Sequence, residues 1–206
     1  MSEPSDIGST APGHYGVASA SGNELLAFRQ LRIAAGWNLQ GDPFDPTFMA
    51  QVRRSFAIDG LPAANTTCET DLLRVFWLGP TSWLLLARGP VTDSHPLARL
   101  AVQREAVNHA AGALFDLSAA RVAWQLSGPR AATVLASGCP LDLHPRVFPA
   151  GACAQSLFGH VGALVVCGAE REFSLFVARS LAGEAWWALC ATGAQYGYEV
   201  LPPGAF

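Results

Sequence analysis

The sequence predicts an α+β fold made of two ferredoxin-like βαββαβ halves with antiparallel sheets. The first observation is the order of segments: strand, helix, hairpin, helix and strand are followed by a similar series with one extra strand. The second is a pair of turns, at 79–82 and at Gly159-His160, each between two strand-like apolar runs. We expect an N-terminal arm over 1–28, a first α+β unit over 29–118 and a second over 119–206. The arm is rich in Ser, Gly, Ala and Pro and has almost no periodicity, which is typical of a flexible segment.

Each element of the first unit has a local signal. Residues 31–39 contain two short apolar runs that we interpret as one first strand. Asp45 is a suitable N-cap and Pro46 suits the first helical position, so a helix follows, with Phe48, Val52 and Phe56 on one face. The rest is predicted as a loop over 61–70, a hairpin over 72–87, a helix from His95-Pro96 and a strand over 113–117.

The second unit contains the longest predicted loop. Alternating Val122, Trp124 and Leu126 predict a strand, and Pro129 starts a short helix for which Gly138 is the expected left-handed C-cap. The fourteen residues 139–152 then form a proline-containing loop, and a loop that long in a compact domain is usually functional. A hairpin over 153–167, a strand over 172–178, a helix after Ser180 and a strand over 196–201 complete the unit.

Composition limits the class of protein. Of the 206 residues, 50% are hydrophobic and only 14% are charged, so little charge is left to cover the surface and part of it is expected to contact another protein. The net charge of −3, with scattered basic residues, argues against nucleic-acid binding. No apolar run approaches the roughly 20 residues that a membrane span needs, and no secretory signal is visible. Five cysteines without a CxxC pair fit a reducing, cytoplasmic setting.

Motifs for chemistry are missing or weak. Neither a dinucleotide-binding G-x-G-x-x-G nor a Walker loop occurs. Cys139, His144, Cys153 and His160 do not have the spacing of a zinc site, and nothing local would lower the thiol pKa of Cys153 for a nucleophile pair with either histidine. We therefore expect no catalytic, cofactor-binding or metal-binding residue in this chain, and interpret it as a scaffold or binding subunit.

The polar residues around the long loop have two readings. Asp116 and Asp142 are expected to bond to their own backbone in turns. Arg121, Arg130 and Arg146 surround the loop and suit bidentate ion pairs with carboxylates, either within the chain or on a partner, and the sequence leaves both open. The predicted subunit interface is Arg130, Asp142, His144, Arg146 and Phe148.

One long motif resembles a known family. Over roughly residues 35–190, the sequence resembles the gamma subunits of heterotetrameric sarcosine oxidases. The matching runs are Asp116-Leu117-Ser118, Leu126-Ser127-Gly128-Pro129-Arg130-Ala131, Gly138-Cys139-Pro140-Leu141-Asp142-Leu143-His144-Pro145-Arg146, Phe148-Pro149, Gly151-Ala152-Cys153-Ala154-Gln155, Arg179-Ser180-Leu181-Ala182 and Trp77-Leu78-Gly79-Pro80-Thr81-Ser82. In the last run the family commonly has an acidic residue at the position of Ser82.

The resemblance implies a role in a larger enzyme. That family is similar in fold to the folate-binding glycine cleavage T-protein. It belongs to a four-subunit flavoenzyme that oxidises sarcosine to glycine and hydrogen peroxide and passes the one-carbon unit to tetrahydrofolate or releases it as formaldehyde. The resemblance implies alpha, beta and delta subunits as partners, with FAD and FMN on beta and NAD and tetrahydrofolate on alpha. Asp116 does not match the carboxylate with which T-proteins hold folate, so no family site residue is carried over.

Three alternatives stay open at this point. The same architecture could serve a complex acting on another N-methyl amino acid, such as N-methylglutamate or dimethylglycine, because substrate choice lies on the flavin subunit. A free-standing folate-dependent aminomethyltransferase would need an anchoring carboxylate. A cysteine-dependent hydrolase or redox protein would need a reactive thiol.

Overall fold

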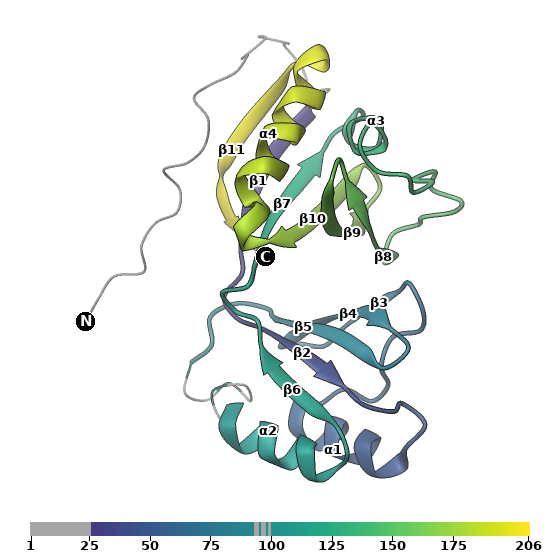
Figure 1. Ribbon diagram of the computed structural model, residues 1–206, viewed down its shortest axis with the longest axis vertical. Coiled ribbons are helices and arrows are strands. Elements are labelled where there is room, and N and C mark those ends of the chain that lie inside the picture. The colour runs from purple at the N-terminus through teal and green to yellow at the C-terminus, as the bar shows by residue number, and fades with distance from the viewer. Residues whose placement is uncertain (1–25, 93–94, 96–97, 99) are drawn as a thin grey trace, which may run out of the picture.

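The computed structural model describes residues 26–92, 95, 98 and 100–206, and these form two lobes stacked along the long axis (Figure 1). The lower, five-stranded lobe holds β2 (Gly36–Gln40), α1 (Pro46–Phe56), β3 (Thr67–Glu69), β4 (Leu73–Gly79), β5 (Ser82–Ala87), α2 (Leu100–His109) and β6 (Ala113–Asp116). The upper, six-stranded lobe holds β1 (Leu26–Arg32), β7 (Arg121–Ser127), α3 (Ala131–Ala136), β8 (Cys153–Phe158), β9 (Val161–Ala169), β10 (Glu172–Ala178), α4 (Ala182–Gly193) and β11 (Tyr198–Ala205).

Both sheets have the strand order of a ferredoxin-like unit. The five-stranded sheet runs β3-β4-β5-β2-β6 with antiparallel neighbours throughout, so its first strand β2 lies between β5 and β6. The six-stranded sheet runs β11-β1-β7-β10-β9-β8, which is the same pattern with β1 inserted between β11 and β7. Only the β1–β11 pair is parallel among the strand pairs of the described chain. The predicted α+β fold with antiparallel sheets is confirmed.

Three local predictions differ from the structure. The segment 31–39 is not one strand: Leu26–Arg32 pairs within the six-stranded sheet, and Gly36–Gln40 pairs within the five-stranded one. Strand β1 also begins inside the predicted arm, because Leu26 and Phe28 both point into the core; the rest of the arm lies outside the described residues. The predicted loop 61–70 contains β3, which is three residues long and too short to show periodicity. The predicted helix start at His95-Pro96 also falls partly outside the described residues, and α2 is assigned from Leu100.

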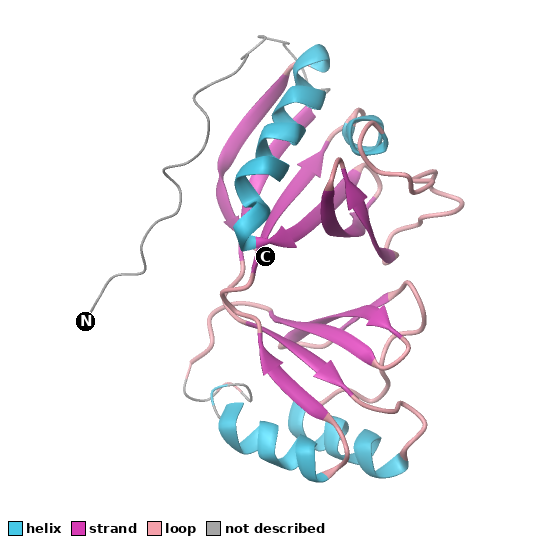
Figure 2. Ribbon diagram, viewed as in Figure 1, coloured by secondary structure: helices cyan, strands magenta, loops and turns pink. Residues whose placement is uncertain are grey.

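Each sheet is buried on both faces, which gives helix, sheet, sheet and helix layers (Figure 2). In β5, Trp83, Leu85 and Ala87 pack in the cluster under α1 and α2, whereas Leu84 and Leu86 face the other sheet. Strand β9 divides in the same way. Two buried faces explain why these strands are continuous apolar runs rather than alternating ones.

An interlobe core joins the two sheets. It consists of Leu31, Phe76, Leu84, Leu86, Ala123, Cys153, Leu164, Val166 and Phe176, all buried. The rings of Phe76 and Phe176 lie 5.6 Å apart, and the ring of Phe206 lies 5.2 Å from that of Phe176. The C-terminal residue therefore packs against the seam between the lobes. None of the helices described is long and apolar enough to cross a membrane.

Candidate docking surface

The long loop between α3 and β8 is held from inside by apolar side chains. Cys139, Leu143 and Phe148 are buried in the core of the six-stranded lobe. Gly138 precedes them and is not the predicted left-handed cap, because its φ is not positive. A Cβ there would lie 2.9 Å from the ring of Phe158, so glycine is required by close packing instead. The loop is therefore held against the lobe by its own buried side chains.

Local hydrogen bonds shape the tip of the loop. Oδ1 of Asp142 accepts the backbone N–H of His144 at 2.9 Å, which confirms the predicted turn. Nδ1 of His144 accepts the backbone N–H of Arg146 at 3.2 Å, and the His144 carbonyl accepts the N–H groups of Val147 and Phe148. Asp116 likewise accepts the N–H of Ser118 at 2.8 Å, as predicted. These bonds give the tip a defined conformation before any partner binds.

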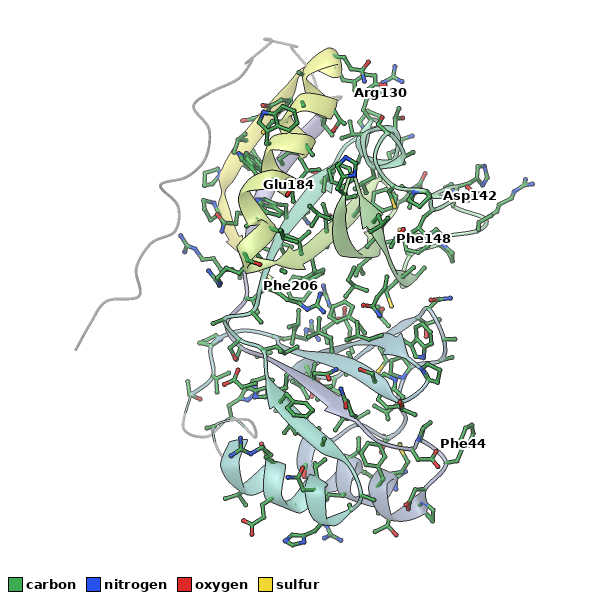
Figure 3. The ribbon with its side chains drawn as sticks, viewed as in Figure 1. Phe44, Arg130, Asp142, Phe148, Glu184 and Phe206 are labelled. Carbon is green, nitrogen blue, oxygen red and sulfur yellow. The ribbon has the colours of Figure 1, made fainter. Side chains whose placement is uncertain are left out.

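Four of the five predicted interface residues lie on the surface. Arg130, Asp142, His144 and Arg146 are exposed, and Asp142 projects from the side of the upper lobe (Figure 3). Phe148 differs, because it is only 6% exposed and belongs to the lobe's own core. Its side chain supports the loop and is not available as a surface contact. Its neighbour Val147 is instead a large hydrophobic side chain that the loop exposes, at 62%.

The arginines around the loop do not form ion pairs with carboxylates of this chain among the described residues. The guanidinium of Arg130 lies over the ring of Tyr196, 5.4 Å from its centroid. Burial lowers the pKa of Arg121 from its ordinary value. For Arg146, the reading as an intrachain pair is therefore not supported within the described chain, and its charge is presented to the outside.

The C-terminal end of the loop joins the two lobes. The carbonyl of Gly151 accepts hydrogen bonds from the backbone N–H of Thr67 at 2.9 Å and from its hydroxyl at 3.1 Å. The N–H of Cys153 donates to the carbonyl of Asn65 at 2.9 Å. The sequence does not predict this junction, because β3 is only three residues long and carries no strand pattern. The end of the loop at Gly151 is therefore tied to the other lobe, whereas most of the tip, 142–147, is exposed.

The cysteine and histidine side chains do not form a reactive pair. The thiol of Cys153 is fully buried and donates to the carbonyl of Thr66 at 3.2 Å, whereas His144 is exposed on the loop. Burial is the main cause that raises the pKa of Cys153 to about 11, which disfavours the nucleophilic thiolate. Cys139 is also buried, with Sγ 3.6 Å from the hydroxyl of Ser156. In the described part of the chain, no three His, Cys, Asp or Glu side chains are grouped as metal ligands would be.

Comparison with known proteins identifies the family. A model of the sarcosine oxidase gamma subunit family matches residues 40–195. The chain is 35% identical over 133 residues to the sarcosine oxidase subunit gamma of Corynebacterium sp. strain U-96, an alignment that covers 64% of this chain and 61% of the relative. It is 43% identical over 74 residues to that of Corynebacterium sp. strain P-1, covering 36% and 34%. The chain thus spans less than two thirds of the length of the curated relatives it matches.

Two solved structures are similar in fold. A chain of the heterotetrameric sarcosine oxidase from Corynebacterium sp. U-96, in complex with pyrrole 2-carboxylate, aligns with a TM-score of 0.75 and 27% identity, covering 86% of this chain and 88% of that one. The glycine cleavage system aminomethyltransferase T from Bartonella henselae aligns with a TM-score of 0.57 and 14% identity, over 88% of this chain and 48% of that one. The second likeness concerns the fold alone and agrees with the predicted T-protein-like architecture. Because the family model matches most of the chain, this protein belongs to the sarcosine oxidase gamma subunit family.

Proposed function

We propose that this chain is the non-catalytic gamma subunit of a heterotetrameric sarcosine oxidase. The complex would demethylate sarcosine oxidatively to glycine, with hydrogen peroxide as a product and the one-carbon unit passed to tetrahydrofolate or released as formaldehyde. The observation that carries the proposal is the family match over 40–195, supported by the alignment with the heterotetrameric enzyme over 86% of the chain.

Partner subunits hold the redox cofactors in this proposal. Alpha, beta and delta subunits are the partners, and FAD, FMN, NAD and tetrahydrofolate are bound there rather than on this chain, in a cytoplasmic complex. The buried, high-pKa thiol of Cys153 supports a structural role for that residue. The tip of the loop between α3 and β8 docks on a partner through Asp142, His144 and Arg146, whose exposed side chains sit on a locally hydrogen-bonded turn, and Arg130, exposed at the start of α3, extends the same surface.

Co-expression with the three partner subunits tests the assignment. We expect a tagged form of this chain to co-purify with alpha, beta and delta as a yellow, flavin-containing complex that oxidises sarcosine. The control is the same preparation without this chain. A stable monomer that does not associate with the partners would refute the proposal.

Substitution of the loop tip tests the docking surface. Arg146→Ala removes a charge that has no carboxylate partner among the described residues, so we expect unchanged folding but about tenfold weaker assembly. Turnover per assembled complex should stay close to that of the wild type, because this chain holds no reacting group. The matched control is Arg54→Ala, an exposed arginine of α1 on the other lobe. A large loss of turnover in fully assembled enzyme would contradict the non-catalytic role.

A further inference from the structure

The first helix of the lower lobe is preceded by an aromatic residue that is almost wholly exposed. Phe44 is 91% exposed, whereas the other exposed large hydrophobic side chains in the described part of the chain range from 37% to 65%. Each of those other side chains has at least about a third of its surface covered by the rest of the protein. A scattered half-exposed side chain needs no special explanation, but a phenylalanine presented almost whole to solvent is a large unburied apolar surface.

The turn that carries Phe44 is held in one conformation. Oδ1 of Asp42 accepts the N–H of Phe44 at 2.9 Å, and the Asp42 carbonyl accepts the N–H of Asp45 at 3.1 Å. Gly41 ties the start of the turn to the β4–β5 hairpin, because its N–H donates to the carbonyl of Thr81 at 3.1 Å. Pro43 additionally restricts the backbone next to Phe44. The backbone that carries the aromatic side chain is therefore held in place before any partner binds.

The far side of the turn is fixed as well. Asp45 is the N-cap of α1, and its Oδ1 accepts the N–H groups of Thr47 at 2.7 Å and Phe48 at 3.3 Å. Pro46 follows at the start of the helix. A side chain on a pre-organised turn loses less conformational entropy on binding, which is the property of an interface anchor.

Phe44 and the loop tip project from the same side of the molecule, one from each lobe. Figure 3 shows Asp142 at the side of the upper lobe and Phe44 at the same side of the lower lobe, pointing away from the body. The interlobe core joins the two lobes between these points. One partner lying along this side would meet both features.

From these observations we propose that Phe44 is a second docking anchor for the partner subunit that contacts the 142–147 loop tip. This proposal rests on the proposed function. The partner's pocket that receives the Phe44 ring is apolar. Because Asp42 precedes Phe44 in the sequence and Asp45 follows it, the rim of that pocket carries an arginine or a lysine. The anchor is part of a protein–protein surface and touches no substrate.

A competition experiment tests the anchor in the complete complex. Wild-type chain and Phe44→Ser are co-expressed in equal amounts with the alpha, beta and delta subunits, and intact mass spectrometry of the purified complex gives the ratio in which the two are incorporated. We expect wild type to be favoured by about ten- to thirty-fold. Val102→Ser is the matched control: Val102 is 65% exposed on α2, and this variant should be incorporated as often as wild type.

A second variant separates the conformation of the turn from its charge. Asp42→Ala removes the acceptor for the Phe44 N–H, whereas Asp42→Asn keeps an oxygen there and removes the charge. We expect both variants to be incorporated into the complex less often than wild type, and Asp42→Ala to be incorporated less often than Asp42→Asn.

The outcomes distinguish the inference from the proposed function. Equal incorporation of Phe44→Ser and wild type would overturn the anchor while leaving the gamma-subunit assignment intact. Failure of wild type to assemble would overturn both. If the isolated wild-type chain forms a dimer that Phe44→Ser dissociates, the occupant is a second copy of the chain and the proposed partner is wrong.

Discussion

The interlobe core predicts that the two lobes unfold together. Phe76 lies on β4 with 0% exposure, and its ring lies 5.6 Å from that of Phe176 on β10 and 5.9 Å from that of Phe206. Phe76→Ala therefore removes a fully buried ring between two sheets that are fixed by their own strand pairing. Because neighbouring strands cannot move in to fill the space, we expect the free energy of unfolding to fall by about 3–5 kcal/mol.

This loss is large compared with the stability of a typical domain, which is about 5–15 kcal/mol. Urea denaturation followed by tryptophan fluorescence measures it, since Trp37 and Trp83 report on the five-stranded lobe and Trp124 and Trp186 on the six-stranded one. We expect one transition, shifted to lower urea. The control Phe44→Ala removes a ring of the same size at a 91% exposed site and should change stability by less than about 0.5 kcal/mol.

Two results would refute this reasoning. A loss below about 1 kcal/mol for Phe76→Ala would mean that the sheets repack freely and the interlobe core is not a well-packed layer. Two separate transitions, with only the five-stranded lobe affected, would mean that the lobes are independent.

Three further predictions concern local features. Asp45→Ala removes the N-cap of α1 and should cost about 0.5–2 kcal/mol in urea denaturation, with Asp45→Asn close to wild type. Gly138→Ala places a methyl group 2.9 Å from the ring of Phe158 and should cost about 1–3 kcal/mol, whereas Gly79→Ala meets open space and serves as its steric control. Burial raises the pKa of Cys153 from 9.0 to about 11, so the folded state binds the proton more tightly than the unfolded state. The contribution of Cys153 to stability is complete below pH 9 and is lost as the pH rises toward 11. Chemical labelling of this thiol in the native chain should be slow at pH 8 and should accelerate between pH 9 and 11. Rapid labelling at pH 8 would contradict its burial.

Sequence patterns predicted the architecture well where the signal was local. The cap at Asp45, the hairpin turns and the backbone bonds of Asp142 and Asp116 depend on a few neighbouring residues, and each is observed. The assignment of β1 to the upper lobe was not predictable in this way. Its apolar residues do not alternate strictly, and its partners β7 and β11 lie about 95 and 170 residues away along the chain.

The candidate surface shows the same limit. The polarity of Asp142, His144 and Arg146 predicted an exposed loop tip, and all three are exposed. Phe148 was expected on that surface, but its apolar ring packs in the lobe's own core. Phe44 was not singled out, because its exposure results from the Asp42 turn directing it away from α1, and composition does not contain that geometry.

A rigid junction between the lobes would keep the two parts of the proposed docking surface at a constant distance. The loop tip belongs to one lobe and Phe44 to the other, so their separation is constant only if the lobes do not move relative to each other. The interlobe core supplies apolar contact, and the hydrogen bonds of Gly151 and Cys153 to the β3 region fix the same two sheets at one edge. A partner that binds one anchor then finds the second already in place, which raises its affinity without any new contact within the chain. In the proposed docking, the residues that join the lobes support assembly through the distance they maintain, and the exposed residues support it through contact with the partner.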